Sequence, residues 1–191
     1  MMSRFPAPSA PRSEAVYDEL LVVMVQSGDR RAFDRLHRRW NTRLARAAQR
    51  YTGNADAARD LSQECWLAIW KGLGRLRHPS RFRAYAFGVL HRRGASYIKS
   101  AIKTRARHAA HDGSVEPSES ARQDDRSALA QAFAALPPDQ RFAAHLYFVE
   151  GLTLSEIAEA QSIPTGTAKS RLFHARQKLK AALQDPFEGD V

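Results

Sequence analysis

Residues 151–183 have the spacing that most restricts how this chain can fold. Thr153 is followed three residues later by Glu156, a capping box that starts a helix sharply. Pro164 cannot continue that helix, which is therefore short. Thr165 is then suited to cap a second helix that runs to about residue 183. Two consecutive helices joined by so tight a turn are typical of a helix-turn-helix.

The apolar residues of this segment are spaced so that the two helices can share one small core. Ala158 falls where the helices cross, and a larger side chain there would hold them apart. The other members are Leu154, Ile157, Ile163, Ala168 and Leu172. In a helix-turn-helix the second helix enters the major groove and its N-terminal residues reach the base edges. Residues 165–183 are therefore the candidate reading helix.

The charge of the reading helix agrees with a role in binding DNA. No Asp or Glu occurs between Ala160 and Gln184, so the cations of this segment are not neutralised locally. Residues near the start suit base edges, and the later cations suit phosphates. For any single residue, the alternative that it does not bind DNA is strong. Phe173 can be packed inside, and His174 can be simply exposed. The candidate DNA-binding residues are Thr165, Thr167, Lys169, Ser170, Arg171, Phe173, His174 and Arg176.

A second basic segment, residues 65–111, contains no acidic residue at all. Its eleven Lys and Arg leave 19 cations and 20 anions for the rest of the chain, out of 30 and 20 in total. Four aromatic residues are interleaved with these cations: Phe82, Tyr85, Phe87 and Tyr97. Cations with aromatic residues between them suit a nucleic-acid strand whose bases can stack. The alternative is a solubilising helix face, but such faces usually mix both signs.

Periodicity predicts an all-α chain of two small helical domains. Helices are expected over residues 17–27, 29–51, 54–71 and 81–107 in the first domain, and over 126–135, 138–151, 153–162 and 165–183 in the second. Between them, residues 108–125 contain Gly, Pro, Ser and carboxylates with little to bury, and are expected to form a flexible acidic linker. The predicted organisation is a disordered tail at 1–16, domains at 17–107 and 126–184, and a short tail at 185–191.

Composition narrows the functional class further. The single cysteine, Cys65, cannot form an intramolecular disulfide, and no apolar run is long enough to span a bilayer. We therefore expect a cytoplasmic protein without membrane insertion. His108 and His111 lack further ligands for a metal, and no phosphate-binding loop or activated nucleophile is found. No catalytic residue, metal, cofactor or small-molecule substrate is predicted, and the chain is not expected to be an enzyme.

Two sets of motifs resemble one protein family. SEIAEAQSIPTGTAKSRLFHARQKL, preceded by LPPDQR, is similar to the promoter-reading C-terminal domain of bacterial sigma factors of the extracytoplasmic-function (ECF) branch, group 4 of the sigma-70 family. DLSQECWLAIWKGL resembles the polymerase-docking helix of the same family, and FRAYAFGVLHRRGASYIKS its promoter-melting segment. Both sets occur in the family's order on either side of the linker. The resemblance implies sigma domain 2 for residues 17–107 and sigma domain 4 for 126–184.

What the resemblance implies is a mechanism of transcription initiation. Asp60, Gln63 and Glu64 match the positions that hold the clamp helices of core RNA polymerase. The reading helix matches the part that recognises the minus 35 element as a duplex. Residues 81–99 match the segment that opens the minus 10 element and captures a flipped base. The implied minus 10 residues are Arg81, Arg83, Tyr85, His91, Arg92, Arg93 and Lys99.

Three departures from the family pattern occur: Tyr85, followed by Ala86, stands where the pattern FRAWL has Trp, Arg92 follows His91 where Asn commonly follows Arg, and His174 stands where many relatives have Arg. Besides core polymerase and promoter DNA, the family implies a cognate anti-sigma factor and a role in stress response. Two rival functions fit the sequence less well. A self-sufficient helix-turn-helix activator or repressor would leave the first domain unexplained. An enzyme acting on nucleic acid would need the catalytic motifs that are missing.

Overall fold

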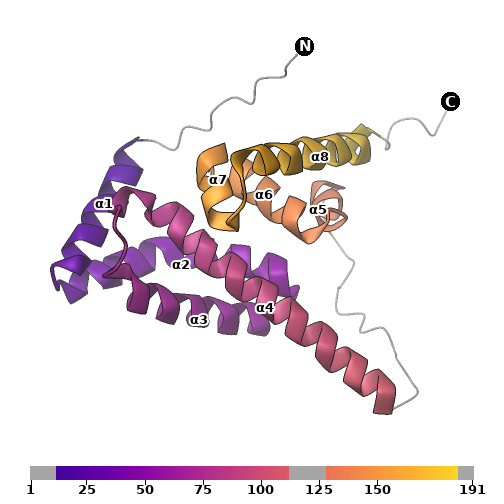
Figure 1. Cartoon of the computed structure of the whole chain (residues 1–191), viewed down its shortest axis with the longest axis horizontal. Helices are drawn as coiled ribbons and strands as arrows, with labels where there is room; N and C mark the ends of the chain where they lie inside the picture. The colour runs from indigo at the N-terminus through magenta and orange to yellow at the C-terminus, as the bar shows by residue number, and fades with distance from the viewer. Residues whose placement is uncertain (1–11, 112–127, 185–191) are drawn as a thin grey trace. The chain divides into compact units, whose positions relative to one another are not determined.

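The computed structural model describes residues 12–111 and 128–184, and within these residues every regular element is helical. The elements are α1 (Arg12–Gln26), α2 (Arg30–Thr52), α3 (Ala55–Leu73), the 3₁₀ turn η1 (Pro79–Arg81), α4 (Phe82–His111), α5 (Ala128–Ala134), α6 (Pro138–Phe148), α7 (Leu154–Gln161) and α8 (Thr165–Gln184). The chain divides into two compact units, the first containing α1 to α4 and the second α5 to α8 (Figure 1). The all-α fold in two small helical domains is thus confirmed.

Side-chain caps determine where the second and third helices begin. The carboxylate of Asp29 accepts hydrogen bonds from the backbone N–H groups of Arg31 and Ala32, at 2.8 and 3.2 Å. The side-chain oxygen of Asn54 likewise accepts from Asp56 and Ala57, at 2.9 and 3.0 Å. Each cap satisfies backbone donors that a helix leaves without a partner. Both caps stand at the first residues of the ranges expected for these two helices.

The core of the first unit is centred on α2, which packs against both α3 and α4. The indole of Trp40 is fully buried and lies edge-on to Phe82, with ring centroids 5.0 Å apart. Phe87 approaches the same indole at 5.7 Å. Such aromatic pairs add to the stabilisation that burial already gives. The other large, fully buried side chains here are Leu21, Leu36, Leu44, Ile69, Leu73 and Leu90.

The first helix starts at Arg12 rather than at Tyr17, so residues 12–16, expected in the tail, are helical. Glu14 in the first turn favours this start, because a carboxylate stabilises the positive end of the helix dipole. Polar contacts hold α1 in place. Buried Asp18 pairs with Arg39 at 2.6 Å, and the amide of Gln26 donates to the carbonyl oxygens of Leu73 and Leu76, at 3.0 and 2.8 Å.

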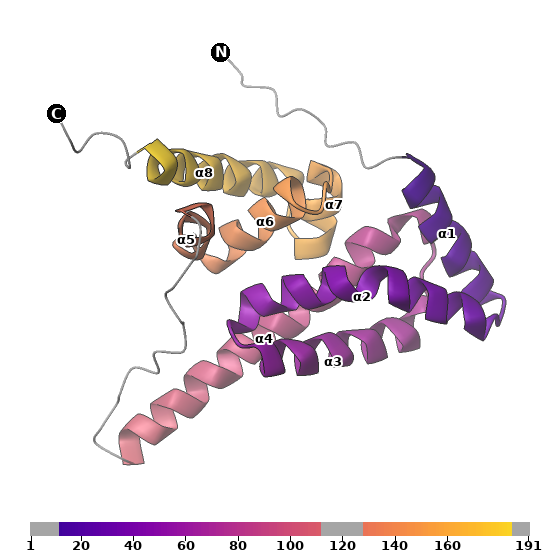
Figure 2. The ribbon, with the colours of Figure 1, turned by 180° about the vertical axis from the view of Figure 1, so that it is seen from behind.

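Helix α4 is longer than predicted, ending at His111 rather than at residue 107. Residues 108–111 contain neither Gly nor Pro, so nothing in them stops a helix. Figures 1 and 2 both show α4 continuing past the ends of α2 and α3. Residues 82–90 are therefore enclosed by the unit, while the last turns of α4 have no helix of that unit beside them.

In the second unit α8 packs against α5, α6 and α7. One row of α8 is buried, at the helical spacing of Ala168, Leu172, Ala175 and Leu179. Opposite this row, buried Leu136, Phe142, Leu146, Leu152 and Ile157 complete a small core. Because only one side of α8 is used for packing, its other side is left to solvent.

Candidate nucleic-acid and protein interfaces

The turn before α8 has the geometry that the sequence predicted. The hydroxyl of Thr153 accepts from the backbone N–H of Glu156 at 3.3 Å, and the Glu156 carboxylate accepts from the Thr153 N–H at 2.8 Å. Ser162 then takes the left-handed conformation that ends α7, and the Ile163 N–H donates to the carbonyl of Ala158 at 2.9 Å. Ala158 is 6% exposed. The angle between α7 and α8 is thus set by backbone contacts.

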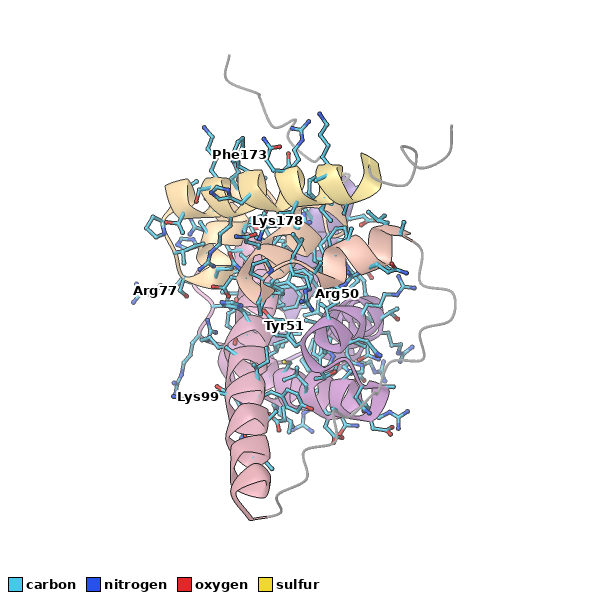
Figure 3. The ribbon with its side chains drawn as sticks, turned by 90° about the vertical axis from the view of Figure 1, so that its right-hand side faces the viewer. Arg50, Tyr51, Arg77, Lys99, Phe173 and Lys178 are labelled. Atoms are coloured by element: carbon cyan, nitrogen blue, oxygen red, sulfur yellow. The ribbon has the colours of Figure 1, made fainter. Side chains whose placement is uncertain are left out.

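Six of the eight predicted residues of the reading helix are exposed. They are Thr165, Lys169, Ser170, Phe173, His174 and Arg176. Phe173 is 49% exposed and projects from α8 (Figure 3), which rules out the alternative that it is packed inside. An aromatic ring held in solvent among cations has no packing role within its unit. This face is therefore available for a ligand.

The two remaining residues have structural contacts. Thr167 is half-buried, and its carbonyl accepts a hydrogen bond from the Ser170 hydroxyl at 3.3 Å. Arg171 is also half-buried and forms an ion pair with Asp139 at 2.7 Å, which ties α8 to the first turn of α6. Thr165 is the first residue of α8 rather than its cap, since the N–H groups of Thr167 and Ala168 donate to Pro164.

The electrostatics of the second unit also involve Arg176. Burial raises the pKa of the Tyr147 hydroxyl, and the positive charge of Arg176 partly opposes that rise. Burial likewise lowers the pKa of Arg141, whose guanidinium donates to the carbonyl oxygens of Ala134 and Leu136. Arg141 thus closes the α5–α6 turn. Arg176 itself is exposed.

In the first unit, two of the aromatic residues expected to stack on bases are in the core instead. Phe82 is 1% exposed and Phe87 fully buried, because both pack on Trp40. The expectation that bases stack on these two rings is therefore wrong. Arg83 was predicted to contact DNA, but it is only 8% exposed and points into the unit. Residues 82–90 are buried almost throughout, since α4 is enclosed on several sides there.

Two of the predicted polymerase-binding residues and three of the predicted minus 10 residues meet in one groove between α3 and α4. The groove has a volume of about 800 Å³ and is lined by Asp60, Glu64, Tyr85, Arg92, Arg93 and Tyr97 among others. An ion pair between Arg93 and Glu64, at 3.0 Å, crosses it. Burial raises the pKa of Tyr85, and Arg92 partly opposes that rise. Tyr85 and Tyr97 are the two aromatic rings that this groove offers to a ligand.

His91 is held by Tyr51 at the end of α2. The Tyr51 hydroxyl and the Nδ1 atom of His91 are 2.8 Å apart, and both side chains are half-buried. The Tyr51 ring lies over Gly94, where an added Cβ atom would come within 2.7 Å of it. The other predicted residues of this segment, Arg81, Arg92 and Lys99, are exposed, and Lys99 extends outward from α4 (Figure 3).

The three predicted polymerase-binding residues do not share one surface. Asp60 and Glu64 face α4, whereas Gln63 lies on the other flank of α3, in a groove with Phe33, Trp66 and Trp70. Trp66 is 6% exposed and donates its indole N–H to Asn41 at 3.2 Å, while Trp70 is 46% exposed. Trp66 is therefore a core residue, and Trp70 is available for an interface.

Sequence reasoning missed Leu67, which is 61% exposed. It lies one helical turn beyond Gln63 and Glu64, and its apolar character led to no prediction. The signal that can find it is its spacing, because i, i+3 and i+4 neighbours share a helix face. Leu67 and Trp70 therefore add an apolar part to the predicted docking residues.

No group of three potential metal ligands occurs among the residues that the structure describes. Cys65 is buried, and burial raises its thiol pKa to about 12, with Arg93 lowering and Glu64 raising it to smaller extents. The thiol is therefore protonated and unreactive at neutral pH. The side chains of His108 and His111 lie outside the described part of the chain. The search for a membrane-spanning helix among the described residues found none of sufficient length and apolarity.

Comparisons with known proteins agree with this architecture. Residues 36–110 match the family model for sigma-70 region 2, and residues 126–179 match that for sigma-70 region 4. The chain is 31% identical to RNA polymerase sigma-H factor of Pseudomonas aeruginosa, over 87% of this chain and 94% of the relative. It is 26% identical to ECF RNA polymerase sigma-E factor of Escherichia coli K12, over 90% of this chain and 97% of the relative.

Two solved structures have a similar fold. CnrH, solved in complex with the cytosolic domain of CnrY, aligns with a TM-score of 0.65 and 24% identity, over 87% of this chain and 97% of its own. The sigma factor RpoE of Bartonella quintana, solved with the anti-sigma factor NepR, aligns with a TM-score of 0.62 and 22% identity, over 81% of this chain and 98% of its own.

Proposed function

The chain belongs to the sigma-70 family as a sigma factor of the ECF type, and from this premise we propose that it directs core RNA polymerase to promoters with two separate DNA-binding surfaces. Sigma factors are transcription initiation factors rather than enzymes. We assign core docking and minus 10 opening to residues 17–107, and minus 35 reading to residues 126–184. We assign the role of tether to the residues between α4 and α5.

Reading of the minus 35 element is supported by the exposed face of α8, which is the observation that carries the proposal most directly. Lys169, Ser170 and His174 lie in its first half, where a reading helix reaches base edges. Arg176 lies further along, where a cation meets phosphate. Arg171 acts differently, because its pair with Asp139 makes it a positioning residue.

Opening of the minus 10 element is supported by the groove between α3 and α4. A strand that leaves its duplex loses stacking at each step, which costs a few kcal/mol, on the order of what one aromatic contact per base returns. Tyr85 and Tyr97 supply the rings, in place of buried Phe82 and Phe87. Arg81, Arg92 and Lys99 are exposed cations that can follow the phosphates of the displaced strand.

Docking on core RNA polymerase is supported by exposed residues on both flanks of α3. Asp60, Gln63 and Glu64 supply polar contacts, and exposed Leu67 and Trp70 supply apolar area. Aromatic residues at such positions often dominate the energetics of an interface. An anti-sigma factor is proposed as a regulator that covers these surfaces, in line with the family.

The test is transcription in vitro with core enzyme on a genomic library. Wild type is compared with the Asp60→Ala/Glu64→Ala variant and with Lys169→Ala. The double variant is expected to weaken core binding at every promoter, and Lys169→Ala to change which promoters are used while core binding stays unchanged. Gel-shift titrations with and without core separate the rival. Tight, specific promoter binding by the isolated chain, with no need for core, would show a self-sufficient activator or repressor.

A further inference from the structure

A second groove lies on the opposite flank of α3, between α2 and α3. Its volume is about 840 Å³, and among its twelve lining residues there is no Asp or Glu. Three arginines line it, Arg46 and Arg50 from α2 and Arg59 from α3. The remaining polar lining includes His37, Asn41 and Gln49. The groove is therefore cationic, with neutral hydrogen-bonding groups between its charges.

The charge count of the whole chain does not reveal the cations of this groove. Outside residues 65–111 the charges nearly cancel, but α2 alone carries eight arginines and a single acidic residue, Asp34. Figure 3 labels one of these arginines, Arg50, beside Tyr51 on α2. Arg59 has one acidic neighbour, Asp56, at 3.8 Å, with both side chains largely exposed. Such a long surface pair contributes little and leaves Arg59 able to bind another carboxylate.

This cationic groove is continuous with the apolar groove that contains Trp66, Leu67 and Trp70. The two share His37, Asn41 and Gln63 in their linings. The shared floor is ordered, because the His37 and Trp66 rings are 4.6 Å apart and Asn41 accepts from the Trp66 indole. From Trp70 to Arg59 the surface thus follows α3 for roughly 16 Å, at about 1.5 Å per residue. One end is apolar and the other is positively charged.

We propose that the cationic groove of Arg46, Arg50 and Arg59 binds an acidic segment of the polymerase surface that docks on α3. The inference rests on the proposed function, and extends the docking surface to α2, which no prediction included. Carboxylates suit the site because the planar guanidinium of arginine binds them through two parallel hydrogen bonds. A segment that is apolar at one end and acidic at the other matches both halves of the surface.

Nucleic acid is the weaker alternative for this groove. The residues proposed to meet the melted strand face α4, and α3 stands between them and the cationic groove. A duplex is too wide to enter a groove between two adjacent helices, so it would touch the arginine tips and leave Asn41 and Gln49 without a role. It would also leave the adjoining Leu67 and Trp70 uncovered.

The experiment measures the affinity of the full chain for core RNA polymerase over a series of salt concentrations. The test variant is Arg46→Glu/Arg50→Glu/Arg59→Glu. Its matched control is Arg31→Glu/Arg35→Glu/Arg38→Glu, which makes the same charge change at exposed positions of α2 that line neither groove. The test variant is expected to bind core roughly tenfold more weakly or worse, with a flatter salt dependence, while the control stays near wild type.

Three results would overturn the inference. Equal weakening in both variants would mean that only net charge matters, and no weakening in either would mean that the groove is not used. If the test variant binds core normally but its holoenzyme loses affinity for a single-stranded promoter oligonucleotide, then the ligand is nucleic acid. Unfolding curves for each variant, and a neutral Arg46→Gln/Arg50→Gln/Arg59→Gln variant, exclude a folding defect.

The outcome for the proposed function is read separately. Failure of wild type to bind core would contradict the proposed function itself. Normal wild-type binding that is lost in the Asp60→Ala/Glu64→Ala variant, but kept in the arginine variants, would sink only the inference about the cationic groove.

Discussion

Helices α4 and α8 look alike in sequence, yet they use their residues in different ways. Both are long, basic and free of acidic residues. In α8 the buried row and the exposed face are separate, so a residue either packs or is available to bind. In residues 82–90 of α4 nearly every residue is buried, including Arg83 and two phenylalanines. Basic composition therefore indicates a binding helix, but only its packing shows which residues can bind.

The largest difference should come from replacing a buried phenylalanine of α4 and an exposed phenylalanine of α8 with alanine. Phe87→Ala leaves a cavity beside Trp40 and should lower the free energy of unfolding of the first unit by about 3 to 5 kcal/mol. Phe173→Ala removes an exposed ring and should change stability by less than about 0.5 kcal/mol. All three tryptophans, Trp40, Trp66 and Trp70, are in the first unit, so fluorescence during urea unfolding measures that unit alone.

The effects of the two substitutions on DNA binding should be the reverse of their effects on stability. Phe173→Ala should weaken duplex minus 35 binding by the holoenzyme, whereas the folded fraction of Phe87→Ala should open promoters normally. If Phe87→Ala keeps the unfolding midpoint of wild type but loses promoter opening, then Phe87 contacts DNA. In that case α4 and α8 do not differ in how they use their phenylalanines.

Two helical glycines provide the next comparison. Gly94→Ala places a Cβ against the Tyr51 ring and should cost about 1 to 3 kcal/mol. Gly166→Ala, in the first turn of α8, meets nothing within 4 Å and should stabilise the second unit by about 0.5 to 1 kcal/mol. Fluorescence follows the first unit, and helical circular dichroism follows the second. Stabilisation by Gly94→Ala would mean that Tyr51 is not held over α4.

Alkaline pH should also affect the stability of the two units differently. The pKa of Cys65 is about 12 in the fold and 9.0 ordinarily, so above pH 9 the thiol ionises in the unfolded chain first. The unfolded state then binds fewer protons, and stability falls as the pH rises, by about 1 kcal/mol per pH unit toward pH 11. The slope in wild type should exceed that in Cys65→Ala, measured by fluorescence. Equal slopes would contradict a buried, protonated thiol, and the second unit, which has no cysteine, should show no such difference.

The smallest effect is expected for the ion pair that joins the two predicted binding sets. A double-mutant cycle on Glu64 and Arg93, with alanine at each position, should give a coupling of about 0.2 to 1 kcal/mol, since both side chains are partly exposed. The equivalent cycle on Asp139 and Arg171 should give a similar value or a larger one, because the Arg171 side chain is more buried. A coupling near zero at both pairs would mean that neither pair holds its helix.

Much of the fold followed from local rules. Capping residues such as Asp29, Asn54 and Thr153 are read directly from the sequence, and the helix starts they predict are those observed. The reading helix could also be predicted from the sequence, because its apolar residues have a single clear period. Local rules failed where several helices surround one segment. Nothing near Phe82 or Arg83 in the sequence tells that Trp40, some forty residues earlier, lies against this part of α4.

The site residues show the same limit. Gln63 and Glu64 are adjacent in the sequence and were assigned to one surface, but they face different grooves on opposite flanks of α3. The cationic groove needs residues from both α2 and α3, and periodicity within one helix cannot reveal such a pairing.

The position of Trp40 also affects the order in which the protein can fold during synthesis. Its ring is covered by Phe82 and Phe87, which are made 42 and 47 residues later. At bacterial rates of synthesis this interval lasts roughly 2 to 10 s. During that time α2 and then α3 emerge, while the Trp40 indole is not yet covered by Phe82 and Phe87. The nascent chain therefore displays an apolar surface that a chaperone can bind. The first unit closes only when the start of α4 leaves the ribosome.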